Sequence, residues 1–237
     1  STLRLRATGH IDVPGVTGGL PEAYLAQIAI SEVMVDPEGL FTQPVTFGEG
    51  AIDLRLRLDP FRLDVGQFTL IDDGRVLSAS GSATADARGW RVAGDIALDA
   101  IRHDRLMALW PVSAVAKTRQ WLVENVQEGL LRNVRMAIRA EQGQEPQLSL
   151  GYDFVQGDVR FLKTLPPIRK GSGYATLEDF TYTMVLDEGQ ITPPLGGTID
   201  MAGSVFSVLD IRHKPAQAEI RLHTDSTLTA ALSLLDE

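Results

Sequence analysis

The residues best able to do chemistry are the four histidines, His10, His103, His213 and His223. No two of them have the close spacing of paired metal ligands, and the absence of cysteine excludes thiolate catalysis and cysteine metal sites. His103 precedes Asp104, but no Gly-x-Ser-x-Gly motif supplies a nucleophile for such a pair. We interpret this segment as a solvated turn that enters a helix, with Asp104 near the positive end of the helix dipole.

Two pairs of adjacent acidic residues are the second candidate for a catalytic site. A glycosidase needs two carboxylates that face each other across a bond, and adjacency in sequence does not supply that arrangement. The pairs Asp72-Asp73 and Asp187-Glu188 each precede a glycine, so we predict that both are turn residues. Gly171-Ser172-Gly173 lacks the rest of a phosphate loop. The sequence therefore predicts no enzyme, with no catalytic residue, cofactor or metal.

The composition of the chain limits which kinds of partner it is expected to bind. The 237 residues carry 22 basic and 31 acidic side chains, a net charge of −9, which argues against a nucleic-acid partner. No apolar run reaches the roughly 18–20 residues of a membrane-spanning helix, and no signal peptide is present. The chain starts at Ser1 in a strand-like run and stops at Glu237 in mid-pattern, so we expect it to be a piece of a longer protein whose anchor lies elsewhere.

Alternation of apolar and polar residues dominates the chain and predicts strands with one apolar face. The alternating segments are 28–31, 52–59, 135–139, 148–154, 220–223 and 227–232. Turn signals separate them: Asp36-Pro37-Glu38-Gly39, Asp72-Asp73-Gly74, Ala87-Arg88-Gly89, Asp187-Glu188-Gly189, Pro193-Pro194 and Lys214-Pro215. This order predicts a mainly β fold built as an antiparallel meander.

About two short helices are expected around 104–128, where they would cap or lid the sheet. Trp110-Pro111 ends the first, and Ser113 is the expected cap of a second helix that runs to Glu128 and stops at Gly129. The apolar stripe of this helix would be Val115, Leu122, Val126 and Leu130. The expected organisation is a β segment over 1–103, a helical insertion over 104–130 and a β segment over 131–237, all in one continuous domain.

Residues 68–76 resemble residues 183–191, each an apolar run followed by two acidic residues and a glycine. Duplication of a hairpin and convergent turn chemistry both explain this likeness.

The apolar strand faces are the only large feature left for function. Two arrangements remain open: the faces pack together as a sandwich core, which the pattern favours, or they line an open groove, which the small number of helices favours. In the second case Arg55, Arg57, Arg135 and Arg139 face the other side. The predicted groove-lining residues are Ile52, Leu54, Leu56, Met136, Ile138, Leu148 and Leu150.

One stretch resembles a known family. Trp110-Pro111, then Arg119-Gln120-Trp121-Leu122, then Gly129 is similar to a run in the AsmA-like envelope proteins of Gram-negative bacteria, of the YhdP and TamB type. The order of Leu165-Pro166-Pro167-Ile168, Gly189-Gln190-Ile191 and Gly196-Gly197-Thr198-Ile199-Asp200 extends the resemblance over roughly residues 50–237.

The resemblance implies a periplasmic segment of a long protein anchored in the inner membrane. It implies an elongated, twisted, taco-like sheet whose groove carries phospholipid or another acyl-chain lipid between the inner and outer membranes without a cofactor. Two other functions remain open: a structural module of the envelope that docks a protein partner, and an envelope hydrolase, which needs converging catalytic groups that the sequence does not provide.

Overall fold

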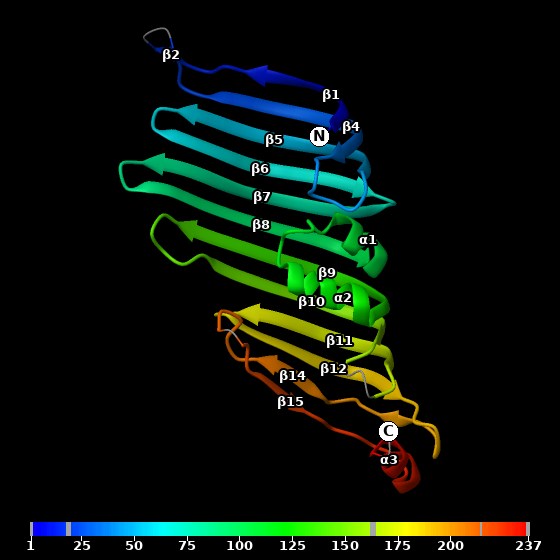
Figure 1. Cartoon of the computed structure of the whole chain (residues 1–237). Helices are drawn as coiled ribbons and strands as arrows, with labels where there is room; N and C mark the ends of the chain where they lie inside the picture. The colour runs from blue at the N-terminus through cyan, green and yellow to red at the C-terminus, as the bar shows by residue number, and fades with distance from the viewer. Residues whose placement is uncertain (1, 18–19, 162–164, 214, 236–237) are drawn as a thin grey trace. The chain divides into compact units, whose positions relative to one another are not determined.

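The computed structural model describes every residue except 1, 18–19, 162–164, 214 and 236–237 (Figure 1). The long strands are β1 (Thr2–Asp12), β4 (Tyr24–Asp36), β5 (Val45–Leu58), β6 (Phe61–Asp72), β7 (Arg75–Asp86), β8 (Gly89–Arg102), β9 (Val126–Glu141), β10 (Gln147–Val159), β11 (Ile168–Glu178) and β12 (Thr181–Ile191). The short strands are β2 (Val16–Thr17), β3 (Leu20–Pro21), β13 (Ile199–Asp200), β14 (Val205–Val208) and β15 (Ala218–Arg221). The helices are α1 (His103–Leu109), α2 (Ala116–Asn125) and α3 (Leu228–Leu235).

The strands follow one another across a single antiparallel sheet. Within the described residues, 13 strands have the order β1-β4-β5-β6-β7-β8-β9-β10-β11-β12-β14-β15, with β13 beside β12, and β2 and β3 form a separate ribbon. β1 and β15 end this order and do not pair with each other, so the sheet is not closed. The predicted mainly β antiparallel meander is therefore confirmed.

The local sequence explains the tight turn that joins β6 to β7. Asp73 and Gly74 both have positive φ angles, 50° and 73°, in the turn between β6 and β7. Glycine adopts such angles without strain, and aspartate tolerates them better than most residues. Asp72 then pairs directly with Arg75, which fixes the register of the two strands.

Two compact units divide the described chain. Unit 1 comprises Ser1–Asp99 and Arg135–Ser149, and unit 2 comprises Ala100–Val134 and Leu150–Glu237. All three helices belong to unit 2. Unit 1 therefore consists of strands and their connections, with no helix among its described residues.

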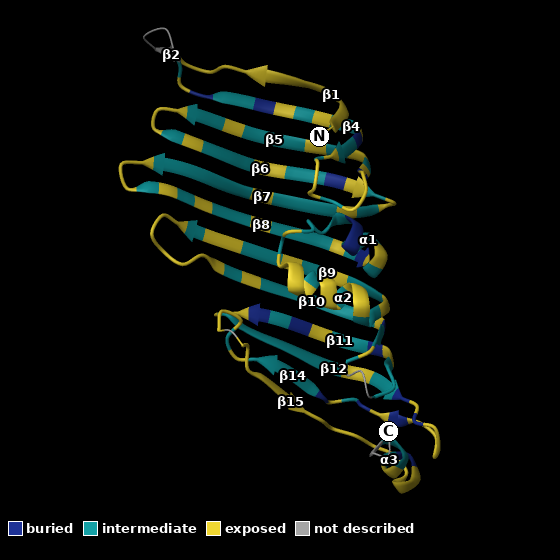
Figure 2. Cartoon of the chain, viewed as in Figure 1, coloured by how far each residue is buried: buried dark blue, intermediate teal, exposed yellow. Residues whose placement is uncertain are grey.

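Burial differs between the units (Figure 2). In unit 2 a small core of Ile191, Ile199, Met201 and Ala230 is at most 4% exposed, and Leu234 of α3 packs against it. In unit 1 most apolar residues of the long strands are half-buried, because no second layer from the same unit lies on them. The described strands of unit 1 lie in one sheet, apart from the β2–β3 ribbon, so the sandwich, one of the two arrangements left open by the sequence, does not form within this unit.

The predicted second helix is wrong in its boundaries. Val115, with φ 47°, precedes α2, and no side chain caps the helix, so Ser113 does not serve as its cap. The helix ends at Asn125, and Val126 and Gly129 lie in β9. The β-branched Val126 favours a strand, and the backbone N–H of Arg160 donates to the Asn125 carbonyl at 2.8 Å at this junction. The expected apolar stripe is thus split between a helix and a strand.

Two further predictions fail towards the carboxyl end. Residues 227–232 alternate like a strand but lead into α3, where the backbone N–H of Ala230 donates to Thr227 Oγ1 at 3.1 Å as in an N-cap. Asp187-Glu188-Gly189 is not a turn, because β12 continues to Ile191 and pairs Gln190 with Arg169 of β11 and Asp200 of β13. The hairpin seen at 68–76 therefore does not recur at 183–191. Lys214-Pro215 includes residue 214, which lies outside the described residues.

No helix in the described chain is both long enough and apolar enough to cross a membrane.

Candidate functional site

An apolar face runs across the strands of unit 1. Residues directly opposite each other in antiparallel strands place their side chains on the same face of the sheet. Leu54 lies opposite Ala26 of β4 and Val65 of β6, and Ile52 lies opposite Ile28 and Phe68. The predicted residues Ile52, Leu54 and Leu56 therefore share one face with apolar neighbours on both sides.

The same face continues through β7 and β8. Phe68 pairs with Ala79, which pairs with Ile96, and Val65 pairs with Gly81, which pairs with Gly94. We call this set the unit 1 apolar face. Its defining members are Ala26, Ile28, Ile52, Leu54, Leu56, Leu63, Val65, Phe68, Ala79, Gly81, Ala83, Val92, Gly94 and Ile96.

Strand β9 adds two predicted residues to this face. A Cβ built on Gly94 would lie 3.4 Å from Ile138 Cγ2, so the Ile138 side chain lies on the side to which Gly94 points. Met136 is two residues earlier in the same strand and shares the face of Ile138. Ile138 is 39% exposed, and Met136 is half-buried. The sheet therefore brings five of the seven predicted residues, two strand groups far apart in sequence, onto one face.

Leu148 and Leu150 lie on one face of β10 together with Tyr152. Leu150 pairs with Leu177 of β11, which in turn pairs with Tyr182 of β12. Tyr152 pairs with Ala175, which pairs with Met184. Leu148 belongs to unit 1, and the unit 2 apolar face begins with Leu150. This face consists of Leu150, Tyr152, Ala175, Leu177, Tyr182 and Met184, to which β14 adds Phe206 and Val208 opposite Met184 and Tyr182.

The opposite face of unit 1 is polar and carries ion pairs between arginine and aspartate side chains. Arg139 donates to Asp95 at 2.8 Å and to the Gly94 carbonyl at 2.8 Å. Arg62 binds both carboxylate oxygens of Asp64 at 2.9 and 2.8 Å, and this hydrogen bonding lowers the pKa of Asp64. Because these side chains stand in water, they mark the solvated face rather than add much stability.

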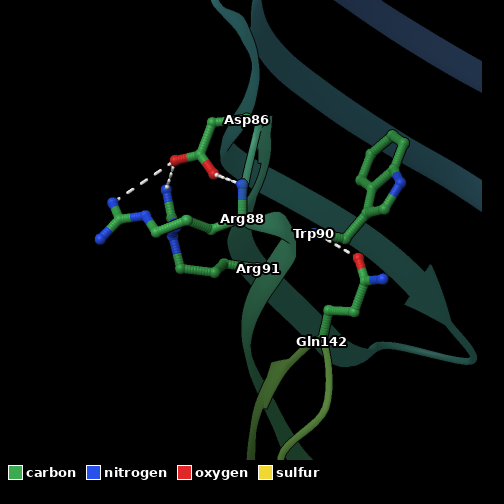
Figure 3. A network of polar contacts seen from close by, with 5 residues as sticks. All are labelled: Asp86, Arg88, Trp90, Arg91 and Gln142. Atoms are coloured by element: carbon green, nitrogen blue, oxygen red, sulfur yellow. Dashed lines mark hydrogen bonds and ion pairs between the residues drawn. The ribbon is translucent and has the colours of Figure 1, made fainter.

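At the turn between β7 and β8, polar contacts of Asp86 lie on one face of the sheet and the Trp90 ring lies on the other (Figure 3). Asp86 accepts hydrogen bonds from Arg91 Nη2 and the Arg88 backbone N–H, both at 2.8 Å, and these contacts lower its pKa to about 2. Trp90 is 54% exposed, and its ring meets the ring of Phe61 edge to face at 5.3 Å. The Trp90 backbone carbonyl also accepts from the Gln142 backbone N–H at 2.9 Å, and the Trp90 backbone N–H donates to Gln142 Oε1 at 3.3 Å. These two bonds connect the start of β8 to the residue that follows β9.

The polar candidates named from the sequence lie in separate elements of the described chain. Asp104 lies in the first turn of α1 and accepts from Arg102 at 3.2 Å, which lowers its pKa, while partial burial lowers the pKa of His103. Asp72-Asp73 lie at the β6–β7 turn, as predicted, whereas Asp187-Glu188 lie within β12. In the part of the chain that the structure describes, no three histidine, aspartate or glutamate residues are grouped as metal ligands.

Sequence reasoning missed the contributions of β6, β7 and β8 to the apolar face. In β7 the face consists of Ala79, Gly81 and Ala83, which alternate with serines and give little contrast in hydropathy. The available signal was the strict alternation of alanine or glycine with serine from residue 78 to 83. The alternation over 148–154 includes Tyr152, but nothing in the sequence indicated its contact with Tyr182, in which the two hydroxyl oxygens lie 2.8 Å apart.

Comparison with known proteins yields no relative: no family model, no curated protein and no solved structure matches the chain.

Proposed function

We propose that this chain binds the acyl chains of phospholipid on its apolar sheet faces and helps to carry lipid between the inner and outer membranes. In this proposal it is a periplasmic segment of an AsmA-like protein anchored in the inner membrane. It acts without a cofactor and catalyses no reaction. The residues that bind lipid in unit 1 are Ile52, Leu54, Leu56, Met136 and Ile138, and in β10 they are Leu148 and Leu150.

The observation that carries the proposal is the unit 1 apolar face. It runs without a charged residue from Ala26 through Leu54, Val65 and Gly81 to Gly94, each opposite the next in register. No described helix of the same unit covers it. Most of its members are half-buried, and Ala26 is 5% exposed. A contiguous apolar surface of this kind is typical of a binding surface.

The energetics suit an acyl chain. Each CH2 group removed from water contributes about 0.8 kcal/mol, so an acyl chain that leaves a membrane needs an apolar surface along its whole length. Aliphatic and small side chains make contact without fixed polar ligands, and such a surface holds a chain at many positions of similar free energy. A lipid on this face can therefore shift along it without breaking a specific contact.

Photo-crosslinking in living cells with radiolabelled phospholipid tests the proposal. A photoreactive residue replaces Leu54 or Ile138 on the apolar face, and in matched variants Arg55 or Ala137, the adjacent residues on the opposite face. Ala137 serves as the control in β9 because its neighbour on the same face, Arg139, is bound to Asp95 and its replacement would break that ion pair. We expect lipid label at Leu54 and Ile138 only. Equal label at both members of a pair, or no label in folded protein, contradicts the proposal.

Strand β1 favours a second candidate, a structural module that docks a protein partner. It lies at one end of the strand order, and all of its residues are exposed, with Leu3 66% and Ile11 63% exposed. An edge strand of this kind can pair with a strand from another chain. Crosslinks from Leu3 or Ile11 to a protein, without lipid label at Leu54, would favour this candidate over lipid binding.

A further inference from the structure

A row of aromatic side chains lies on the unit 2 apolar face. Trp121 of α2 meets Phe161 at 6.2 Å between ring centroids, Phe161 meets Phe206 at 5.3 Å, and Phe206 meets Tyr182 at 6.3 Å. All three contacts are edge to face, the arrangement that aromatic pairs prefer. The row ends at the hydroxyl of Tyr152, which lies 2.8 Å from that of Tyr182.

The two tyrosines reach each other across a strand. Tyr152 belongs to β10 and Tyr182 to β12, and β11 lies between these strands. The residues of β11 opposite them are Ala175 and Leu177, which are only 1% and 6% exposed. The short side chain of Ala175 leaves room for the two phenol groups to meet above the strand.

This pair carries one hydrogen-bond donor too many. Each phenol has one O–H, and the contact between the two hydroxyls uses only one of them. Within the described residues, no acceptor other than its partner binds either hydroxyl. Burial raises the pKa of both tyrosines, so both keep their protons at neutral pH. A half-buried O–H without an acceptor is unfavourable, which makes the pair a ready donor to a ligand.

We propose that the Tyr152–Tyr182 hydroxyl pair donates a hydrogen bond to the ester carbonyl of a glycerolipid whose acyl chain lies on the unit 2 apolar face. This inference rests on the proposed function. An ester carbonyl is an uncharged acceptor attached directly to an acyl chain, so it brings its acceptor onto an apolar surface at small cost. A phosphate group would bring a charge to the same apolar surroundings, which is far more costly. The pair therefore acts as a polar contact within an otherwise apolar binding face.

The test compares diacyl phosphatidylcholine with its dialkyl ether analogue, which lacks both ester carbonyls. Each lipid competes with a fluorescent phospholipid for the full 237-residue chain. We expect the unaltered protein to favour the diacyl lipid by about fivefold, the size that one hydrogen bond provides. The double variant Tyr152→Phe, Tyr182→Phe keeps both rings and should bind the two lipids equally, with its affinity for the ether lipid unchanged.

Tyr174→Phe is the matched control. Tyr174 is 44% exposed and pairs with Asp153, on the face opposite to Tyr152, so this variant should keep the fivefold preference. Circular dichroism checks that each variant is folded. Equal binding of both lipids by the unaltered protein, or a preference that survives in the double variant, overturns the inference and leaves the proposed function standing. Failure of both lipids to displace the probe overturns the proposed function and the inference with it.

Discussion

Two glycines that face each other on the unit 1 apolar face should respond in opposite ways to the same substitution. Gly81 of β7 and Gly94 of β8 are directly paired. A Cβ on Gly81 would lie 2.5 Å from the Ala93 carbonyl oxygen and 3.1 Å from Gly94 Cα, both backbone atoms. A Cβ on Gly94 would meet only Ile138 Cγ2 at 3.4 Å and the Ser80 carbonyl oxygen at 3.9 Å, which are ordinary contacts.

The magnitudes follow from these distances. Alanine at position 81 forces two strand backbones apart, and such overpacking costs about 1–3 kcal/mol. Alanine at position 94 needs no movement, and it removes the conformational freedom that glycine has in the unfolded chain, so we expect a gain of about 0.5–1 kcal/mol.

Urea unfolding of both single variants, followed by circular dichroism, measures the two changes in the free energy of unfolding. Gly81→Ala should unfold at lower urea and Gly94→Ala at higher urea than the unaltered protein. Changes of the same sign and similar size would refute the reasoning, because they would mean that the pairing of β7 with β8 is not as described.

Two other predictions concern single side chains. The pKa of the Asp86 carboxyl should be about 2, and Arg91→Gln should raise it toward 3.8, because the Arg91 hydrogen bond is the largest cause of the shift. NMR of the carboxyl carbon measures the pKa in both proteins. An unchanged Asp86 pKa in the variant would contradict the structure. Because the folded pKa lies below the unfolded value, the contribution of Asp86 to stability should be present above pH 3.8 and disappear as the pH falls toward 2. Ile199→Ala should lower the free energy of unfolding by about 2–5 kcal/mol, because Ile199 is 2% exposed in the unit 2 core. The control Ile220→Ala, at a side chain 50% exposed, should change it by no more than about 0.5 kcal/mol; equal losses in urea unfolding would contradict the assigned core.

Alternation predicted the strands well where large apolar residues alternate with charged ones. Residues 52–58 are the clearest case, because isoleucine and leucine alternate with aspartate and arginine and the register of β5 follows that pattern. The same reasoning failed at 227–232, where leucine, alanine and threonine fit both periods. There Thr227 Oγ1 donates to the Gly196 carbonyl at 2.9 Å and accepts from Ala230 N–H, contacts that favour the helix and depend on a distant loop.

The candidate site was only partly accessible from sequence. Alternation identifies which residues of one strand share a face, and this suffices to group Leu54 with Ile52 and Met136 with Ile138. It does not give the register between strands, which alone brings Gly94 next to Ile138. The Tyr152–Tyr182 contact was even less accessible, because it joins side chains 30 residues apart across an intervening strand.

The order of the sheet, in which nearly every long strand pairs with its neighbours in sequence, has a consequence for how such a chain can change in length. Gain or loss of a whole hairpin at a turn such as Asp73-Gly74 keeps the direction of every other strand and the side on which its apolar residues stand. A single-strand insertion reverses the direction of all that follow. Growth by pairs of strands is therefore the change that this architecture tolerates most readily, and the length of its apolar surface can vary in steps of one hairpin.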